Sequence, residues 1–257
     1  MEERLEREKS FHDQSYATDA RAVLSSYYAI TDVCWRHYRE FINGRAPGRR
    51  LLEYGCGQGG YTFRLAEKGA FVKGIDLSEV AIAAARRTAE EKRIPIDFQV
   101  MDAERLTFPD ESFDLIYGAG ILHHLDLERS LGELARALTP RGEAIFLEPL
   151  GHNPFLNLYR KLTRQLRTED EHPLRWPDLR QADRHFGSVE CRFFNLTTLF
   201  AVPLLKFPSL PGLPRLFALL HAVDRLLFRR IPFLRRYAWN VAMILSDPRR
   251  PPPLTQS

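Results

Sequence analysis

The chain has 257 residues, of which 44% are hydrophobic and 27% are charged, and its formal net charge is +4. This composition is typical of a globular chain, and it contains no run of about 20 apolar residues that would span a bilayer. The net charge is too small to indicate a nucleic-acid partner. Cys34, Cys56 and Cys191 are spaced neither as a disulfide framework nor as a zinc motif, so we expect no metal site. The charged start Met1–Lys9 is not followed by the apolar segment of a signal peptide, which predicts a cytoplasmic location.

The pattern along the chain changes near residue 47. Residues 1–46 are expected to form helices rich in aromatic side chains, and the breaker sequence Gly44–Gly48 ends them. After this break, short apolar runs alternate with helical stretches. The strands are expected at Arg50–Tyr54, Phe71–Ile75, Ile96–Val100, Phe113–Tyr117 and Glu143–Leu147, and the helices at Tyr61–Lys68, Glu79–Lys92 and Leu127–Leu138. This alternation predicts an α/β fold with a doubly wound, mostly parallel sheet, and such sheets bind ligands at the carboxyl ends of their strands.

The regularity fades beyond Pro149. Pro154–Arg167 suits an amphipathic helix, while Val189–Phe194 and Ala238–Leu245 suit strands. The proline-rich tail, residues 248–257, is expected to be disordered because it cannot bury much apolar surface.

A glycine-rich turn follows the first expected strand. The spacing Gly55-x-Gly57-x-x-Gly60 satisfies the dinucleotide fingerprint, so the turn alone is equally compatible with NAD. Asp76, about 20 residues later, is placed to accept the ribose hydroxyls of any adenosine cofactor. Neither feature distinguishes the two cofactors.

Two other acidic residues do distinguish them. Glu53 directly precedes the glycine turn, where a carboxylate would repel a pyrophosphate but would suit a cationic amino-acid group. Asp102 ends the third expected strand and could accept a hydrogen bond from an adenine amino group, with the Ala103 N–H available to a ring nitrogen. These positions favour S-adenosylmethionine over NAD.

The chain resembles the class I S-adenosylmethionine-dependent methyltransferases, in particular their ubiquinone- and menaquinone-type branch, over residues 50–149. The motifs that carry the resemblance are Leu51-Leu-Glu-Tyr-Gly-Cys-Gly-Gln-Gly59, Gly74-Ile-Asp-Leu-Ser78, Met101-Asp-Ala103, Phe113-Asp-Leu-Ile-Tyr117, Leu122-His-His-Leu125 and Leu138-Thr-Pro-Arg-Gly142. The resemblance implies a Rossmann-like methyltransferase fold with seven strands. Glu53 stands where the family more often has Asp, which is a small departure.

The resemblance also implies which residues bind the cofactor. The glycine loop would pack on its methionine part, Asp76 would hold the ribose, Leu77 would cover adenine, and Asp102 would bind the adenine edge. The full set implied is Glu53, Gly55, Cys56, Gly57, Gly59, Asp76, Leu77, Asp102, Ala103, Gly118 and Ala119. The alternative for Asp76 and Asp102 is that they cap turns or helices.

Methyl transfer requires little acid–base chemistry, because the sulfonium is already a strong electrophile and the enzyme mainly aligns the acceptor and excludes water. An oxygen or nitrogen acceptor still requires loss of a proton. By their position at strand ends, the candidate catalytic groups are His123, His124, Glu148 and His152, with a structural role as the alternative for the paired histidines. The polar stretch Thr168–His172 is either a cap on the pocket or a solvated loop.

Residues 196–236 are the main departure from the family, whose members usually join their last two strands by a short hairpin. This insertion is apolar, and it carries seven basic residues against the single acidic Asp224. Three roles stay open: a cap packed on the core, an in-plane membrane helix or lid over an apolar substrate, and an oligomer interface. The expected domains are a helical lid (1–46), the cofactor-binding core (47–195 and 237–247), the insertion (196–236) and the tail (248–257).

The sequence therefore predicts an S-adenosylmethionine-dependent methyltransferase that acts on a small metabolite, apolar or amphiphilic if the insertion contacts membrane. The acceptor atom and the oligomeric state are left undetermined. The alternatives are an NAD-dependent oxidoreductase and a cofactor-binding sensor or assembly protein without catalysis. A nucleic-acid substrate is not expected, because the chain has no added basic module and Tyr117-Gly-Ala-Gly120 replaces an Asn-Pro-Pro-Tyr-like motif.

Overall fold

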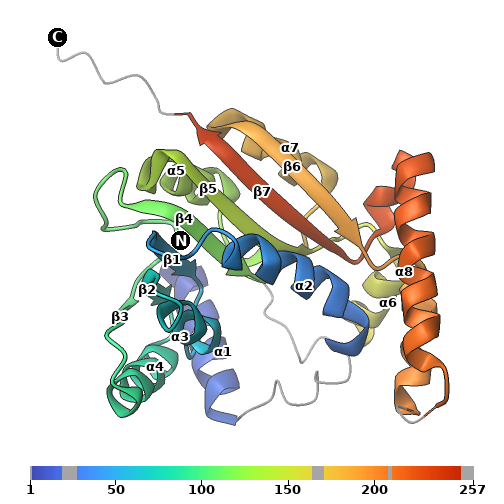
Figure 1. Cartoon of the computed structure of the whole chain (residues 1–257), viewed down its shortest axis with the longest axis horizontal. Coiled ribbons are helices and arrows are strands. Elements are labelled where there is room, and N and C mark those ends of the chain that lie inside the picture. Colours follow the sequence, from blue (N-terminus) through green and yellow to red (C-terminus); the bar gives the residue numbers. More distant parts are fainter. Residues whose placement is uncertain (1, 19–27, 164–170, 208–209, 250–257) are drawn as a thin grey trace.

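A computed structural model describes residues 2–18, 28–163, 171–207 and 210–249. Its centre is one seven-stranded sheet with the order β3-β2-β1-β4-β5-β7-β6 (Figure 1). The strands are β1 (Arg50–Tyr54), β2 (Phe71–Asp76), β3 (Asp97–Val100), β4 (Phe113–Ala119), β5 (Leu138–Pro149), β6 (Phe186–Phe194) and β7 (Asn240–Pro248). The first five strands are parallel to one another, and β7 is antiparallel to both of its neighbours, β5 and β6. The strand order reverses between β1 and β4, so the carboxyl ends of these strands form the place where a ligand is expected.

Helices cover the sheet and create separate apolar clusters with it. The helices are α1 (Glu2–Thr18), α2 (Tyr28–Asn43), α3 (Gly60–Ala66), α4 (Glu79–Lys92), α5 (Leu127–Ala137), α6 (Pro154–Leu162), α7 (Trp176–His185) and α8 (Leu213–Arg230), with short 3-10 helices η2 (Leu122–His124), η4 (Thr197–Lys206) and η5 (Pro232–Tyr237). Side chains of α5 and α7 pack into the largest cluster, and those of α2 and α3 pack into a second one. A third cluster joins α4 to β3. Burial of these faces holds the layers together.

Several helices begin where the sequence supplies a capping side chain. Ser78 accepts the N–H of Ala81 at the start of α4, and Asp126 accepts the N–H of Arg129 at the start of α5. Asn153 does the same for the first turn of α6. Such caps satisfy backbone N–H groups that have no partner inside the helix, which fixes where each helix starts.

Most expected elements are present, with different ends. β1 and α4 have the expected bounds, whereas β5 begins at Leu138, a residue that was expected to end α5. Strand β6 begins three residues early, at Phe186, and α7 was not expected at all. Helix α6 ends at Leu162 rather than at Arg167, and residues 164–170 and 250–257 lie outside the described part of the chain.

The described residues of the insertion, 196–207 and 210–236, are mostly helical and are dominated by α8. The buried Asp224 joins α8 to the start of η4, because it accepts hydrogen bonds from the N–H groups of Leu196 (3.0 Å) and Thr197 (2.7 Å). The Phe200 ring of η4 lies edge-on to Phe155 of α6, so the insertion also contacts α6. Within the described residues, no helix has the length and hydrophobicity that crossing a membrane requires.

Candidate active site

The glycine turn after β1 folds back along β2. Gly55, Gly57 and Gly59 all have positive φ, between 52° and 77°, which other residues rarely adopt. The N–H groups of Gly55 and Cys56 both donate to the Ile75 carbonyl, at 2.9 and 2.8 Å. A Cβ on Gly59 would lie 2.6 Å from the Phe98 ring, so this position has no room for a side chain. The glycines therefore let the turn pack closely against β2 and β3 at the switch point of the sheet.

Glu53, directly before this turn, lies in a mostly apolar setting. Its Oε2 accepts hydrogen bonds from the hydroxyls of Thr62 and Tyr117. Burial raises the pKa of Glu53 to about 8, and the nearby carboxylate of Asp76 acts in the same direction. A cation that arrives beside Glu53 would favour the ionised carboxylate, which fits the expected role of binding an ammonium group.

Asp76 and Asp102 both cap turns, which was the alternative interpretation of their role. Asp76 accepts the N–H of Gly57 (2.8 Å) and of Ser78 (2.9 Å), and Asp102 accepts the N–H of Glu104 (2.8 Å). A carboxylate offers about four lone-pair positions, so these bonds leave capacity for a ligand. By bonding Gly57, Asp76 also holds the glycine turn against β2.

A pocket opens at these strand ends. From the carboxyl side of the sheet it is lined by Gly55, Asp76, Leu77, Ala119, Gly120, Ile121, His124 and Leu125. Its other wall is α1, which supplies Arg4, Leu5, Glu8 and His12. The pocket therefore brings together residues of the glycine turn and of the segments after β2 and β4, and the N-terminal helix α1 forms its remaining wall.

Other residues of the expected cofactor set lie around this pocket rather than among its lining residues. The Cys56 side chain packs in the cluster of Phe98, and Ala103 is buried with its carbonyl accepting the Tyr54 hydroxyl. Gly118 lies against the backbone of β1, where a Cβ would be 2.7 Å from the Tyr54 oxygen. A contact of Cys56 or Gly118 with the cofactor would therefore involve backbone atoms, and it stays a prediction.

Helix α1 is attached to the ends of three strands. Arg4 forms an ion pair with Glu104 and donates to the His124 carbonyl at 2.6 Å. Farther along the helix, Asp13 accepts the hydroxyl of Ser78. A lid was expected from residues 1–46. Arg4 and Asp13 were not identified from the sequence as its contact residues, because no spacing in the sequence links them to Ser78, Glu104 or His124.

The four candidate catalytic residues occupy different places. Glu148 is fully buried on β5; it accepts the N–H groups of Ile121 and Leu122, each at 3.0 Å, and lies 2.7 Å from Nδ1 of His123. His124 lines the pocket, and burial lowers its pKa. Glu148 thus holds the segment after β4 in place through Ile121, Leu122 and His123, while His124 of the same segment faces the pocket.

His152 lies elsewhere. Its Nε2 accepts the N–H of Trp176 at the start of α7 (3.0 Å), and burial lowers its pKa. It is not among the residues that line either pocket in the described part of the chain. The catalytic role of all four residues stays a prediction, and the geometry favours His124.

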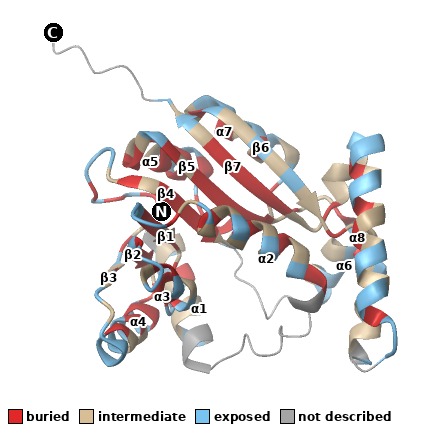
Figure 2. Cartoon of the chain, in the orientation of Figure 1, coloured by how far each residue is buried: buried red, intermediate tan, exposed pale blue. Residues whose placement is uncertain are grey.

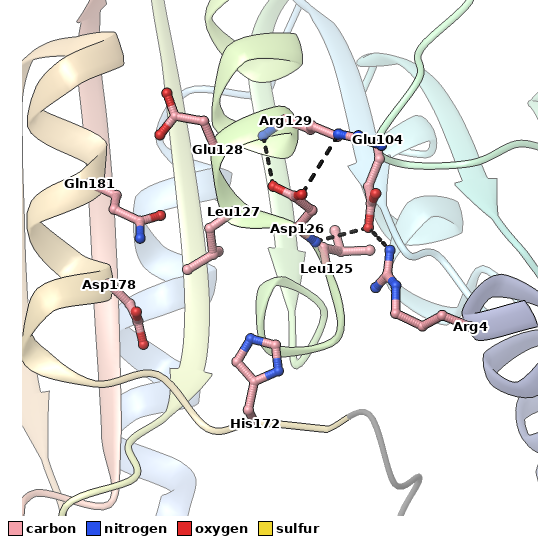
Figure 3. A pocket seen from close by; sticks show the side chains of 10 residues that line it. All are labelled: Arg4, Glu104, Leu125, Asp126, Leu127, Glu128, Arg129, His172, Asp178 and Gln181. Atoms are coloured by element: carbon pink, nitrogen blue, oxygen red, sulfur yellow. Dashed lines mark hydrogen bonds and ion pairs between the residues drawn. The ribbon is translucent and has the colours of Figure 1, made fainter. Parts of the chain in front are cut away.

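A second, open pocket lies beside the first, between α1, α5 and α7 (Figure 3). Its carboxylates are occupied by structural bonds: Glu104 pairs with Arg4, Asp126 caps α5, and Asp178 accepts the N–H of Arg175 at the start of α7 (2.7 Å). His172, of the expected polar stretch, points its ring into this opening, whereas residues 168–170 of that stretch lie outside the described chain. We assign no ligand to this pocket.

Comparison with known proteins identifies the family. The family model described as "Methyltransferase domain" matches residues 52–146. The ubiquinone biosynthesis O-methyltransferase of Nitrosococcus oceani is 32% identical over 177 residues, which cover 65% of this chain and 74% of that protein. The chain belongs to the S-adenosylmethionine-dependent methyltransferase family. The quinone-type branch expected from the sequence is confirmed, and the NAD-dependent oxidoreductase is not supported.

Other methyltransferases show the same relation with lower coverage. The demethylmenaquinone methyltransferase of Thermus thermophilus is 36% identical over 120 residues, which are 46% of this chain and 54% of that protein. The chain thus spans about half the length of the first curated relatives that it matches.

Solved structures confirm the methyltransferase fold. A methyltransferase from Methanosarcina mazei superposes with a TM-score of 0.53 at 26% identity, over 62% of this chain and 90% of that one. A phosphoethanolamine N-methyltransferase from Haemonchus contortus, at 19% identity, superposes with a TM-score of 0.64 over 94% of this chain and 60% of that one. This second similarity concerns the fold alone.

Proposed function

We propose that the protein transfers a methyl group from S-adenosylmethionine to a small hydrophobic or amphiphilic metabolite. The observation that carries the proposal is the pocket in which Gly55, Asp76 and Leu77 meet Ala119 and His124 at the switch point of the sheet. In this arrangement Asp76 would accept the ribose hydroxyls, and the backbone after β4 would border the sulfonium. α1 would exclude water from the reacting atoms, which is the main requirement of methyl transfer.

The chemistry left to side chains is the removal of a proton from an oxygen or nitrogen acceptor. His124 is the candidate that faces the pocket, with its ring 3.1 Å from a Glu8 oxygen. Glu148 and His123 would act by holding the loop that carries His124. The quinone-biosynthesis names of the relatives favour a quinone precursor or a similar amphiphile as acceptor.

The insertion supports a membrane-related acceptor. Figure 2 shows α8 as a helix with long exposed stretches at the edge of the molecule. The exposed large apolar side chains of this region and of α6 are Phe155, Leu158, Tyr159, Leu162, Phe200, Phe207, Leu210, Leu219, Leu226, Ile231 and Phe233. Arginines at 225, 229 and 230 share α8 with two of them. We propose that this surface rests on an anionic membrane at its cytoplasmic face, where such a mixture binds by apolar burial and by charge.

Calorimetric titration with S-adenosylhomocysteine and with NADH tests the cofactor. We expect binding of the first and none of the second; binding of NADH alone would overturn the proposal. The acceptor is then sought by incubating a cell extract with labelled S-adenosylmethionine and the protein, and by identifying methylated products by mass spectrometry. Cofactor binding without any product would favour a non-catalytic sensor or assembly protein.

Sedimentation with anionic liposomes tests the membrane surface. The double variant Phe207→Ser/Leu210→Ser removes two exposed apolar groups of the insertion, and Phe71→Ser removes a comparably exposed ring from β2. We expect the wild-type chain and F71S to pellet with the vesicles and the double variant to shift toward the supernatant. Wild-type protein that stays in the supernatant would contradict membrane binding.

A further inference from the structure

Three potential metal ligands converge where α1 meets the cofactor pocket. Glu8 and His12 stand four residues apart, on one face of α1, and His124 belongs to η2 after β4. Oε2 of Glu8 lies 3.1 Å from Nδ1 of His124 and 3.4 Å from Nε2 of His12. The donor atoms of all three residues lie within 4.8 Å of one another.

These separations are also those expected between ligands of a single ion. Ligands at about 2.0–2.2 Å from a tetrahedral ion are roughly 3.4 Å apart, close to the two distances from Glu8. His124 is only 8% exposed, and its Nδ1 makes no hydrogen bond of standard geometry among the described residues, although the Glu8 oxygen is near. A buried imidazole nitrogen aimed at a carboxylate and a second histidine is the arrangement that a metal ion would complete.

We propose that Glu8, His12 and His124 bind one divalent transition-metal ion of the zinc type at the mouth of the cofactor pocket. Two histidines and one carboxylate are a ligand set of catalytic zinc sites, which keep a further coordination position open. All three residues line the pocket, so the open position would face its interior. The proposal departs from the expectation of no metal that the sequence gives, because His124 lies more than 100 residues from the other two ligands and forms no spacing motif with them.

A neighbouring cluster competes for the same ion. His123, His124 and Glu171 also present three donor atoms within 4.8 Å. We assign the ion to the α1 cluster because Nε2 of His123 is 4.0 Å from Glu171, farther than Glu8 is from either of its two histidines. The shorter distances thus lie on the side of Glu8 and His12.

The consequence for the reaction rests on the proposed function. The ion would bind an oxygen of the acceptor and lower its pKa, so that the hydroxyl proton passes to solvent and His124 would serve as a ligand rather than as the base. The oxygen–methyl bond would form as the sulfur–methyl bond breaks, leaving S-adenosylhomocysteine as a neutral thioether. The acceptor class is then a hydroxylated molecule, and α1 is both a lid and the carrier of two ligands.

Metal binding is measured on the full-length protein, with any affinity tag removed and the metal stripped by a chelator. Zn²⁺ is titrated calorimetrically, and Co²⁺ is added as a spectroscopic probe for its visible ligand-field bands. The variants are Glu8→Gln, His12→Gln and His124→Gln, with Glu171→Gln for the neighbouring cluster. His185→Gln of α7 is the matched control because that histidine contacts Glu128 rather than the cofactor pocket. Circular dichroism establishes that each variant is folded.

We expect micromolar or tighter binding of one Zn²⁺ by the wild-type chain and by H185Q, and at least about tenfold weaker binding by each of the three ligand variants. Absence of binding to the wild-type chain would overturn the proposal. So would loss of affinity in Glu171→Gln with none in His12→Gln, which would place the ion in the neighbouring cluster. Titration of the metal-free protein with S-adenosylhomocysteine is a separate measurement, so failure of the metal site and failure of the proposed function are distinguishable.

Discussion

Glu148 is the buried group whose removal has the most specific expected effect. Its carboxylate is inaccessible to solvent and accepts three hydrogen bonds, from the N–H groups of Ile121 and Leu122 and from the His123 ring. Glu148→Ala leaves two buried N–H groups without a partner, at about 1–3 kcal/mol each. Glu148→Gln keeps an oxygen for both N–H groups, but it removes the charge beside His123 and puts an amide NH2 in place of the oxygen that faces that ring.

We therefore expect Glu148→Ala to lower the free energy of unfolding by about 2–6 kcal/mol and Glu148→Gln by about 1–2 kcal/mol. Urea unfolding followed by circular dichroism measures both values. Glu143→Gln is the control, since Glu143 lies on the same strand but forms a partly exposed ion pair with Arg45, worth at most about 1 kcal/mol. The two variants of Glu148 should also differ in affinity for S-adenosylhomocysteine, because Ile121 lines the pocket.

The difference in free energy of unfolding between Glu148→Ala and Glu148→Gln is the critical result. If both lower the stability equally, the backbone N–H groups do not depend on this side chain and the reasoning is wrong. A loss below about 1 kcal/mol for Glu148→Ala would show that water or a local shift satisfies those groups.

Three further predictions follow from other sites. Burial raises the pKa of Glu53 from 4.5 to about 8, so between these pH values the folded chain keeps a proton that the unfolded chain loses. The free energy of unfolding should therefore fall as pH rises from about 4.5 to about 8. Glu53→Gln should make this fall smaller in urea-unfolding measurements at a series of pH values. Gly118→Ala places a Cβ 2.7 Å from the Tyr54 oxygen and should lower the free energy of unfolding by about 1–3 kcal/mol. In the control variant Gly60→Ala the new Cβ meets nothing within 4 Å, and the free energy of unfolding should change by less than about 0.5 kcal/mol. Asp224→Ala removes the acceptor of two N–H groups at the start of η4 and should speed hydrogen exchange in residues 196–206, measured by mass spectrometry, while β1 stays protected.

Each of these has an outcome that contradicts it. A pH series for E53Q that still parallels the wild-type series would show that Glu53 does not retain the extra proton. Equal effects of the two glycine variants would mean that Gly118 is not confined by the backbone of β1. Faster exchange spread over the whole chain in D224A would indicate global destabilisation rather than release of the insertion.

Much of the fold could be read from local patterns. β1 and α4 have the expected bounds because each is one short apolar or amphipathic run, bounded by a glycine turn or by the Ser78 cap. The errors lie where a neighbour decides the conformation. Leu138 reads as the last turn of α5, yet it pairs with Phe113 as the first residue of β5, and the pairing partner is 25 positions away.

The site divides in the same way. The sequence by itself determined the family, and it placed the glycine turn and the acids Glu53, Asp76 and Asp102 at strand ends. These positions follow from contiguous motifs of a Rossmann-like sheet, and the role of the acids in binding the cofactor stays a prediction. Only the tertiary structure decided that α1 lies over the pocket and brings Glu8 beside His124, and that Glu148 supports the loop after β4. Such contacts join residues far apart in the chain, and they depend on which buried faces pack together rather than on any local spacing.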